Sequence, residues 1–237
     1  TTLRMQRFTY DGLGRVTEVC DKTGDPSPDD GCASGGVVVV SYTYDGIGDF
    51  DGVSCADGNY NAGVELNDDN AAGRLGIAED EEGATAYVYD AVGRIVAVAR
   101  HDGPMGSFNS ANVSCTLYVY NVLGSLTSIV LPTSRTISYG YENDKARPSS
   151  VSVTVASGTP TLIADTITYD ANGAIRSLRW NGGATSERTI NRDNLFRVIE
   201  IEDQYSGTTK SDVVYTYDED GDLLSENDIT APTWLDA

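Results

Sequence analysis

The stretch Tyr10–Val19 reads YDGLGRVTEV, and a close copy, YDAVGRIVAV, returns at Tyr89–Val98. In the first copy Asp11 is followed three residues later by Gly14. Asp is favoured at the first position of a type I turn, and Gly adopts a positive φ without steric penalty. Each copy is therefore predicted to be the tip of a β-hairpin.

Copies of this stretch recur along the chain. Clear copies begin at Tyr10, Tyr44, Tyr89, Tyr120, Tyr169 and Tyr217, and more divergent ones begin at Asp69, Tyr141 and Ile190. Nine copies spaced about 26 residues apart indicate a repeat protein. The predicted structural turn residues are Asp11, Gly14, Asp45, Gly48, Gly73, Asp90, Gly93, Asn121, Gly124, Asp170, Gly173, Asn194, Asp218 and Gly221.

The substitutions in the divergent copies follow turn chemistry. Asn121 and Asn191 replace Asp and keep a side-chain oxygen that can cap the turn. Asn194 replaces Gly, and Asn tolerates the left-handed conformation better than other side chains do. The copy at Tyr141 lacks such a residue, which predicts a longer or differently shaped connection.

The segments on either side of each turn read as strands. Before the turn, aromatic residues stand two apart, as in Tyr87 and Tyr89, which places them on one face of an extended chain. After the turn, β-branched residues alternate without helical spacing, as in Ile95–Val98. We therefore expect an all-β fold of repeated antiparallel hairpins in a curled, spiralling sheet strip of roughly 18 strands. A single domain is expected over residues 1–237, with inserted loops near 20–36 and 49–70.

Composition excludes several classes of partner. The chain has 237 residues and 40% hydrophobic content, which is enough for a packed interior. It carries 16 basic and 36 acidic residues, a net charge of -20, which opposes binding to nucleic acid or anionic lipid. No apolar run is long enough to span a bilayer, and a start at Thr1 without a basic, apolar leader predicts no signal peptide.

The four cysteines are Cys20, Cys32, Cys55 and Cys115. With no CxxC pair and one histidine, disulfides suit them better than a zinc site. A bond between Cys20 and Cys32 would close a loop rich in Pro, Gly and Asp, which contributes about 3 kcal/mol in the chain-entropy model. An oxidising compartment is therefore predicted, the alternative being four free thiols in a reducing cell; the pairing itself stays open.

No catalytic set is apparent in the sequence. His101 is the only histidine, so the chain cannot form two Ser-His-Asp triads or a metal centre with several histidines. We expect His101 in a loop. We expect no enzymatic activity and no cofactor except calcium. The calcium hypothesis rests on carboxylates two residues apart beside a glycine, an arrangement that can surround Ca²⁺. The proposed ligands are Asp49, Asp51, Asp218, Asp220 and Asp222, and the alternative interpretation is a hairpin turn capped by Asp.

Two further features concern surface chemistry. An arginine follows the turn glycine at Arg15, Arg74 and Arg94, where it can pair with the Asp of its own or a neighbouring turn. The insertion between Asp49 and Asn70 is the longest departure from the repeat. It is the loop best suited to bind a ligand.

The motif YDxxGR, repeated in this way from Phe8 to about Asn227, resembles the YD repeat of the Rhs family, shared with toxin-complex C components and teneurins. The resemblance implies a long antiparallel ribbon that spirals into a hollow shell, often around a C-terminal effector. The repeated tyrosines Tyr10, Tyr44, Tyr89, Tyr120, Tyr169 and Tyr217 would line the wall. No stretch resembles the family's autocleavage core, and nothing after Asn227 resembles a toxin domain.

The leading functional hypothesis is a non-enzymatic structural segment of a secreted or surface Rhs-like protein, a β-repeat wall that encloses or presents cargo. Its expected partners are other YD-repeat segments or copies of the same chain, with an effector cargo outside this chain, and its expected location is extracellular or at a bacterial cell surface. One alternative is an adhesive, glycan-binding module that uses exposed tyrosines and the Asp49–Asn70 loop. Another is a filament subunit that self-assembles through open strand edges.

Overall fold

The computed structural model describes residues 4–23, 32, 36–53, 55, 65–103, 113–142, 146–156, 158–180 and 186–230. These residues form one open sheet of 16 strands in chain order, β1 to β16, together with a 3-10 helix, η1 (Gly48–Phe50). Neighbouring strands pair antiparallel, as in β1–β2, β5–β6 and β13–β14, so the all-β prediction is confirmed. No helix in this part of the chain is long and apolar enough to cross a membrane.

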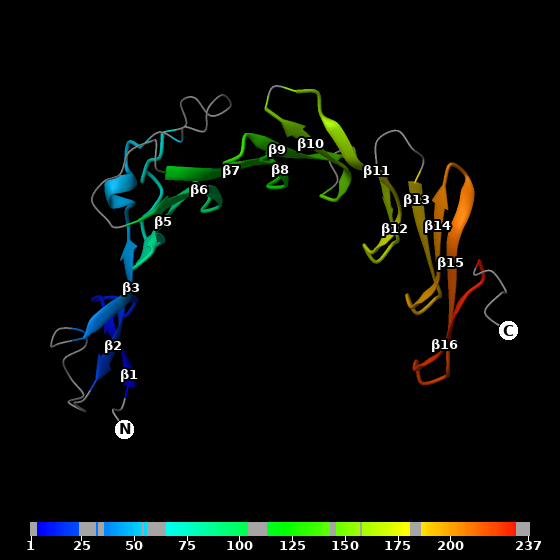
Figure 1. Ribbon diagram of the computed structural model, residues 1–237, viewed down its shortest axis with the longest axis horizontal. Coiled ribbons are helices and arrows are strands. Elements are labelled where there is room, and N and C mark those ends of the chain that lie inside the picture. The colour runs from blue at the N-terminus through cyan, green and yellow to red at the C-terminus, as the bar shows by residue number, and fades with distance from the viewer. Residues whose placement is uncertain are drawn as a thin grey trace. The chain divides into compact units, whose positions relative to one another are not determined.

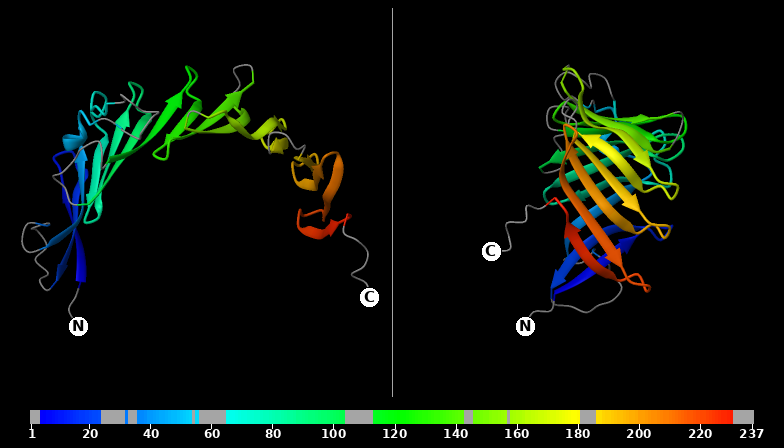
Figure 2. Two further views of the ribbon diagram at one scale, coloured as in Figure 1. Left: turned by 45° about the horizontal axis from the view of Figure 1, so that its top comes forward. Right: turned by 90° about the vertical axis from the view of Figure 1, so that its right-hand side faces the viewer.

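The strands are β1 Arg4–Tyr10, β2 Val16–Thr23, β3 Val37–Tyr44, β4 Leu75–Asp80, β5 Gly83–Tyr89, β6 Ile95–Asp102, β7 Val113–Tyr120, β8 Leu126–Leu131, β9 Arg135–Tyr141, β10 Pro148–Val155, β11 Thr161–Tyr169, β12 Ile175–Trp180, β13 Ser186–Arg192, β14 Val198–Tyr205, β15 Thr208–Tyr217 and β16 Leu223–Asp228. The chain divides into two compact units, one of residues 1–119 with 129–135 and the other of residues 120–128 with 136–237. Figure 1 labels all of these strands except β4, and Figure 2 shows the neighbouring strands β12 to β16 from a second direction.

The same register recurs at five junctions between successive hairpins. The third residue of the second strand of one hairpin lies opposite the fourth-last residue of the first strand of the next. The pairs that follow this rule are Glu18 with Ser41, Ile77 with Ala86, Ala97 with Leu117, Ser177 with Thr189, and Glu200 with Val214. Because a one-residue slip would turn every side chain to the other face, this shared register keeps equivalent positions on one face across these five junctions.

Two of the nine predicted copies form one hairpin. β3 ends at Tyr44 and pairs directly with β4, which begins at Leu75. The N–H of Asp45 donates to the carbonyl of Arg74, and the N–H of Gly73 donates to Oδ1 of Asp45. The residues in between are an insertion within a single turn, which is why the structure describes 16 strands rather than roughly 18.

The core of the first unit lies between this insertion and one face of the sheet. Small side chains on β5 and β6 leave room for it, since Ala84, Ala86, Ala97 and Ala99 are all buried. The insertion fills that space with Ile47, Phe50, Cys55 and Leu66, each at most 1% exposed. In Figure 1, η1 lies beside the strands that it covers. The described residues of the predicted binding loop therefore cover one face of the sheet, and ligand binding by the loop stays a prediction.

A close backbone approach starts the insertion. A Cβ atom on Gly76 would lie well within the van der Waals radius of the carbonyl oxygen of Gly46. Only glycine at position 76 lets the chain leave β3 and pass directly over β4. Gly48, predicted as a turn glycine of a separate hairpin, instead begins η1 with a φ of +49°.

Candidate functional site

The ladder of turns consists of the repeated hairpin tips and the contacts between them. In the described residues six tips share one pattern of backbone hydrogen bonds. In the first, the N–H of Asp11 donates to the carbonyl of Arg15, and the N–H of Gly14 donates to the carbonyl of Asp11. The equivalent first residues of the other five tips are Asp90, Asn121, Asp170, Asp193 and Asp218. The register shifts at the strand end beside the tip, as expected for a type I turn followed by a bulge residue in the left-handed region.

The aspartate side chain holds the turn and the arginine together. Oδ1 of Asp11 accepts hydrogen bonds from the N–H groups of Leu13 and Arg15, at 2.8 and 2.9 Å. Nε of Arg15 lies 2.6 Å from Oδ2 of the same carboxylate. The N–H of Arg15 and then its guanidinium lower the pKa of Asp11. Arg94 with Asp90 and Arg197 with Asp193 repeat the ion pair at 2.6 and 2.7 Å, so the predicted Asp–Arg pairing within a turn is confirmed.

Arginines also connect one hairpin to the next. The guanidinium of Arg15 lies 4.3 Å from the ring centroid of Tyr44 and 2.8 Å from Oδ2 of Asp45. The same stacking joins Arg74 to Tyr89, Arg147 to Tyr169 and Arg197 to Tyr217. Such cation–π contacts contribute about 0.5–1 kcal/mol each at exposed sites.

Tyrosine hydroxyls connect the hairpins in the opposite direction. The hydroxyl of Tyr89 donates to the carbonyl of Leu75, the first residue of the second strand in the preceding hairpin, at 2.8 Å. The same bond runs from Tyr141 to Leu126, from Tyr169 to Pro148 and from Tyr217 to Val198. The rings of Tyr89, Tyr169 and Tyr217 are thus held by two contacts, an arginine on the ring face and a carbonyl at the hydroxyl. Tyr10, Tyr44, Tyr89, Tyr120, Tyr169 and Tyr217 each occupy the last position of a strand.

The divergent turn at Ile190 lies two residues further on than the sequence suggested. Asp193, rather than Asn191, opens it, and Phe196, rather than Asn194, occupies the glycine position with a φ of +64°. Oδ1 of Asp193 accepts from the N–H groups of Leu195 and Arg197, as Asp11 does in its own turn. A turn that placed Asn194 at the glycine position would lack these hydrogen bonds of Asp193. The bonds outweigh the backbone strain of a phenylalanine in the left-handed conformation.

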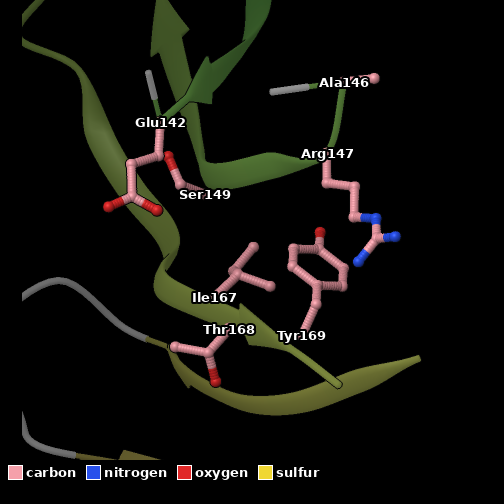
Figure 3. A pocket seen from close by; sticks show the side chains of 7 residues that line it. All are labelled: Glu142, Ala146, Arg147, Ser149, Ile167, Thr168 and Tyr169. Carbon is pink, nitrogen blue, oxygen red and sulfur yellow. The ribbon is translucent and has the colours of Figure 1, made fainter. Parts of the chain in front are cut away.

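The turn at Tyr141 is only partly described. β9 ends at Tyr141 and β10 begins at Pro148, one residue more than the usual spacing, and residues 143–145 lie outside the described part. A pocket of about 620 Å³ opens beside this turn, lined by Glu142, Ala146, Arg147, Ser149, Ile167, Thr168 and Tyr169. Figure 3 shows the guanidinium of Arg147 beside the ring of Tyr169 at the rim. The pocket is therefore bounded by one of the contacts that join hairpins.

The cysteines form two disulfides. Cys20 bonds to Cys32, and Cys55 bonds to Cys115 across 60 residues of sequence. The second bond fixes the inserted cover to β7, because Cys115 lies on the buried face of that strand. The prediction of disulfides is confirmed, and the pairing that the sequence left open is settled.

The calcium hypothesis receives no structural support. Among the described residues no three His, Cys, Asp or Glu side chains come together as a metal site. Asp49 lies in η1 and Asp51 caps its end, whereas Asp218 and Asp222 belong to the last hairpin turn, where the N–H of Asp222 donates to Oδ1 of Asp218. Asp220 lies in the same turn.

His101 is not a loop residue. It lies in β6 and is 2% exposed, between Ala84 on β5 and Val113 on β7. The sequence signal was the alternation from Ala97 through Ala99, which continues to His101 on the same buried face.

Comparisons with known proteins agree with this fold. No protein-family model matches the chain, and no curated protein matches it. The Tc holotoxin pore of Photorhabdus luminescens matches with a TM-score of 0.69 at 14% identity, over 96% of this chain and 10% of that chain. The crystal structure of TcdB2-TccC3 matches with a TM-score of 0.69 at 17% identity, over 96% and 11%. TcdB2-TccC3 without its hypervariable C-terminal region gives 0.68 at 17% identity, over 96% and 10%.

At sequence identities of 14% and 17%, the structural similarity to these proteins establishes a shared fold. The chain spans about a tenth of the length of the chains that it matches.

Proposed function

We propose that this chain is a segment of a β-repeat wall in a Rhs-like protein, and that the wall encloses or presents cargo. The observation that carries the proposal is the two-way contact between successive hairpins, with arginine on the tyrosine face and the tyrosine hydroxyl on the preceding carbonyl. In a repeat protein whose units contact their neighbours, stability grows with each interface that is added. Such an architecture suits an extended wall, and the proposed role is structural rather than catalytic.

The matched structures support the same role. They are toxin-complex proteins, one of the groups whose repeats this sequence resembles, and two of them are structures of TcdB2-TccC3. Because the chain spans about a tenth of their length, we propose that other YD-repeat segments or copies extend the wall. A C-terminal effector outside this chain is the proposed cargo.

The proposed location is extracellular or at a cell surface. Disulfides persist mainly in oxidising compartments, and this chain has two, one of which holds the inserted cover on the sheet.

The test is negative-stain electron microscopy of native particles captured with an antibody against the chain, with light scattering for mass. Hollow particles much heavier than 25.2 kDa would support the proposal. The double variant Arg147→Ala and Tyr169→Ala removes one contact between hairpins. We expect it to give a lower yield of closed particles than the natural chain. Solid fibres, or particles of single-chain mass without an interior, would contradict the enclosing wall.

A further inference from the structure

The strand β11 is one residue longer than the register of its neighbours requires. The register that five other junctions share would place Ser150, the third residue of β10, opposite Thr166, the fourth-last residue of β11. Instead Val151 pairs with Ala164, one residue out of that register. If Thr166 were removed, Asp165 would take its place opposite Ser150, and Val151 would keep its partner. Thr166 is therefore an extra residue in the ladder.

The extra residue forms a β-bulge with a strained backbone. Between the pairs that Asp165 and Thr168 make with β12, both Thr166 and Ile167 lie opposite the single residue Leu178. Thr166 has a φ of +51°, and a β-branched residue rarely adopts this left-handed conformation. Strain of this kind persists only where the surrounding structure holds it, and it is concentrated at binding sites and other functional positions. The bulge therefore marks a place where a binding site is expected.

A groove follows the bulge. This β10–β11 groove consists of two adjoining cavities, of about 620 and 570 Å³, and both are lined by Glu142, Ser149, Ile167 and Thr168. Thr166 also lines the second cavity. In the view of Figure 3, Glu142 and Ser149 lie above the side chain of Ile167, and Thr168 lies below it. Each cavity has the size of a small-molecule site.

Arg147 lines the first cavity and has no carboxylate partner in the described part of the chain. It is exposed, its guanidinium lies 5.4 Å from the ring centroid of Tyr169, and its Nη1 donates to the carbonyl of Asp170 at 3.4 Å. The carboxylate of Asp170 binds another residue. β13 ends in Arg192 where other first strands of hairpins end in tyrosine, and Nη1 of Arg192 lies 2.8 Å from Oδ2 of Asp170. The next turn therefore offers Arg147 a carbonyl instead of a carboxylate.

The equivalent arginine of the first hairpin shows what this position binds. Arg15 immediately precedes β2, as Arg147 precedes β10, and its guanidinium lies over the ring of Tyr44. Oδ2 of Asp45, in the next turn, lies 2.8 Å from Nη2 of Arg15. Hydrogen bonds between a guanidinium and a carboxylate are among the strongest that an arginine makes. A ligand with a carboxylate would supply to Arg147 the partner that Asp45 supplies to Arg15.

We propose that the β10–β11 groove binds a uronic acid, a sugar whose ring carries both a carboxylate and hydroxyl groups. The carboxylate lies against Arg147. The sugar hydroxyls donate to the carboxylate of Glu142 and bond to the hydroxyl of Ser149, and the C–H face of the ring lies on Ile167. The net charge of -20 opposes anions in general, so binding depends on Arg147. The inference goes beyond the proposed wall and does not require that the wall encloses anything.

The test is a titration of the whole chain with galacturonate and with galactose, followed in proton–nitrogen correlation spectra. The two sugars differ only in that galacturonate has a carboxylate where galactose has a CH₂OH group. Galacturonate should shift the Nε–H signal of Arg147 and the backbone N–H signal of Ile167. It should bind about tenfold more tightly than galactose, because it alone can form the charge-assisted pair.

Three variants separate the groove from a general effect. Arg147→Gln should bind the two sugars equally, with the affinity that the natural chain has for galactose. Arg74→Gln is the matched control, because Arg74 lies over Tyr89 in the same way but donates to the carbonyl of Asn70 at 2.7 Å; it should bind galacturonate as the natural chain does. Deletion of Thr166 restores the shared register, so it should raise the melting temperature and abolish the binding of galacturonate.

Equal affinity of the natural chain for both sugars, no binding of galacturonate, or unchanged affinity in Arg147→Gln would overturn the proposal. So would undiminished binding by the Thr166 deletion with a folded spectrum; if that variant does not fold, Arg147→Gln still decides. Displacement of galacturonate by an equal concentration of acetate would show a site for carboxylates in general and would also overturn it. A hollow native particle would still support the wall in each case, so failure of the groove and failure of the wall are distinguishable.

Discussion

The guanidinium of Arg197 lies 4.7 Å from the ring centroid of Tyr217, across the junction between the last two hairpins. The hydroxyl of Tyr217 donates at 2.8 Å to the carbonyl of Val198, the residue that follows Arg197. The two contacts hold opposite ends of one side chain. Hairpin order in this protein is therefore maintained by side chains as well as by the backbone ladder.

Tyr217→Phe is expected to lower the free energy of unfolding by about 1 kcal/mol, because it removes the hydrogen bond to Val198 and keeps the ring. Urea unfolding measures the change. Tyr205→Phe, whose side chain is about half exposed, is the matched control and should change stability by less. An equal loss in the two variants would show that the hydroxyl of Tyr217 has no special role.

Phe196→Gly is expected to stabilise the protein by up to about 1 kcal/mol, because the left-handed conformation strains a phenylalanine and not a glycine. Gly93→Ala is the opposite change, with a φ of +88° and Arg74 against the new Cβ, and should destabilise by about 1–2 kcal/mol or more. Thermal unfolding of both variants tests the pair. A destabilised Phe196→Gly variant would mean that the ring makes contacts that outweigh the strain.

Replacing Cys55 and Cys115 together by Ser is expected to reduce stability by about 4 kcal/mol, since the bond closes 60 residues. Replacing Cys20 and Cys32, 12 residues apart, should cost about 3 kcal/mol. Only the first change should increase hydrogen exchange at Ala84 and Ala86 beneath the inserted cover. Unchanged protection there would show that packing alone holds the cover in place.

Asp212→Asn is expected to raise the melting temperature at pH 7. Burial, followed by Glu200, Glu202 and Asp228, raises the pKa of Asp212 above its ordinary value of 3.8. The folded chain therefore binds the proton of the Asp212 carboxyl group more tightly than the unfolded chain does. The stabilisation of the folded state by this protonation is present at low pH and is lost as the pH rises through the folded pKa. The advantage of the Asn variant should shrink below about pH 4 in a pH series of melting curves; a constant advantage would contradict this cause.

Asp193→Asn should have the opposite pH dependence. Burial opposes ionisation, but hydrogen bonds from the side chain and N–H of Arg197 lower the pKa of Asp193 overall. Its stabilisation is present above about pH 3.9 and is lost as the pH falls through the lower folded pKa. Asparagine can still accept the backbone hydrogen bonds, as Asn121 does. The variant should therefore be less stable at pH 7 and lose less stability on acidification; an identical acid transition would rule out the ion pair as its source.

Local chemistry accounts for the parts that could be predicted. The spacing of Asp11 and Gly14 predicts a turn because both residues act within four positions of each other. The same reasoning failed at Asn194, where two asparagines imitate the motif and the true turn has a phenylalanine at the glycine position. It also failed at Tyr44 and Asp69, because the two halves of one turn, separated by an insertion, resemble two separate copies of the motif.

The sequence by itself determined most of the hairpin tips, the all-β class and the repetition of the hairpin, since each depends on residues close together in the chain. Only the tertiary structure decided that Cys55 bonds to Cys115, that Phe50 is buried against alanines of β5 and β6, and that Arg192 replaces a tyrosine. The residues in each of these relationships are far apart in the sequence, and their spacing in the sequence does not predict that they lie close together in space. These relationships arise when strands pair in a fixed register, which places equivalent positions of successive hairpins side by side.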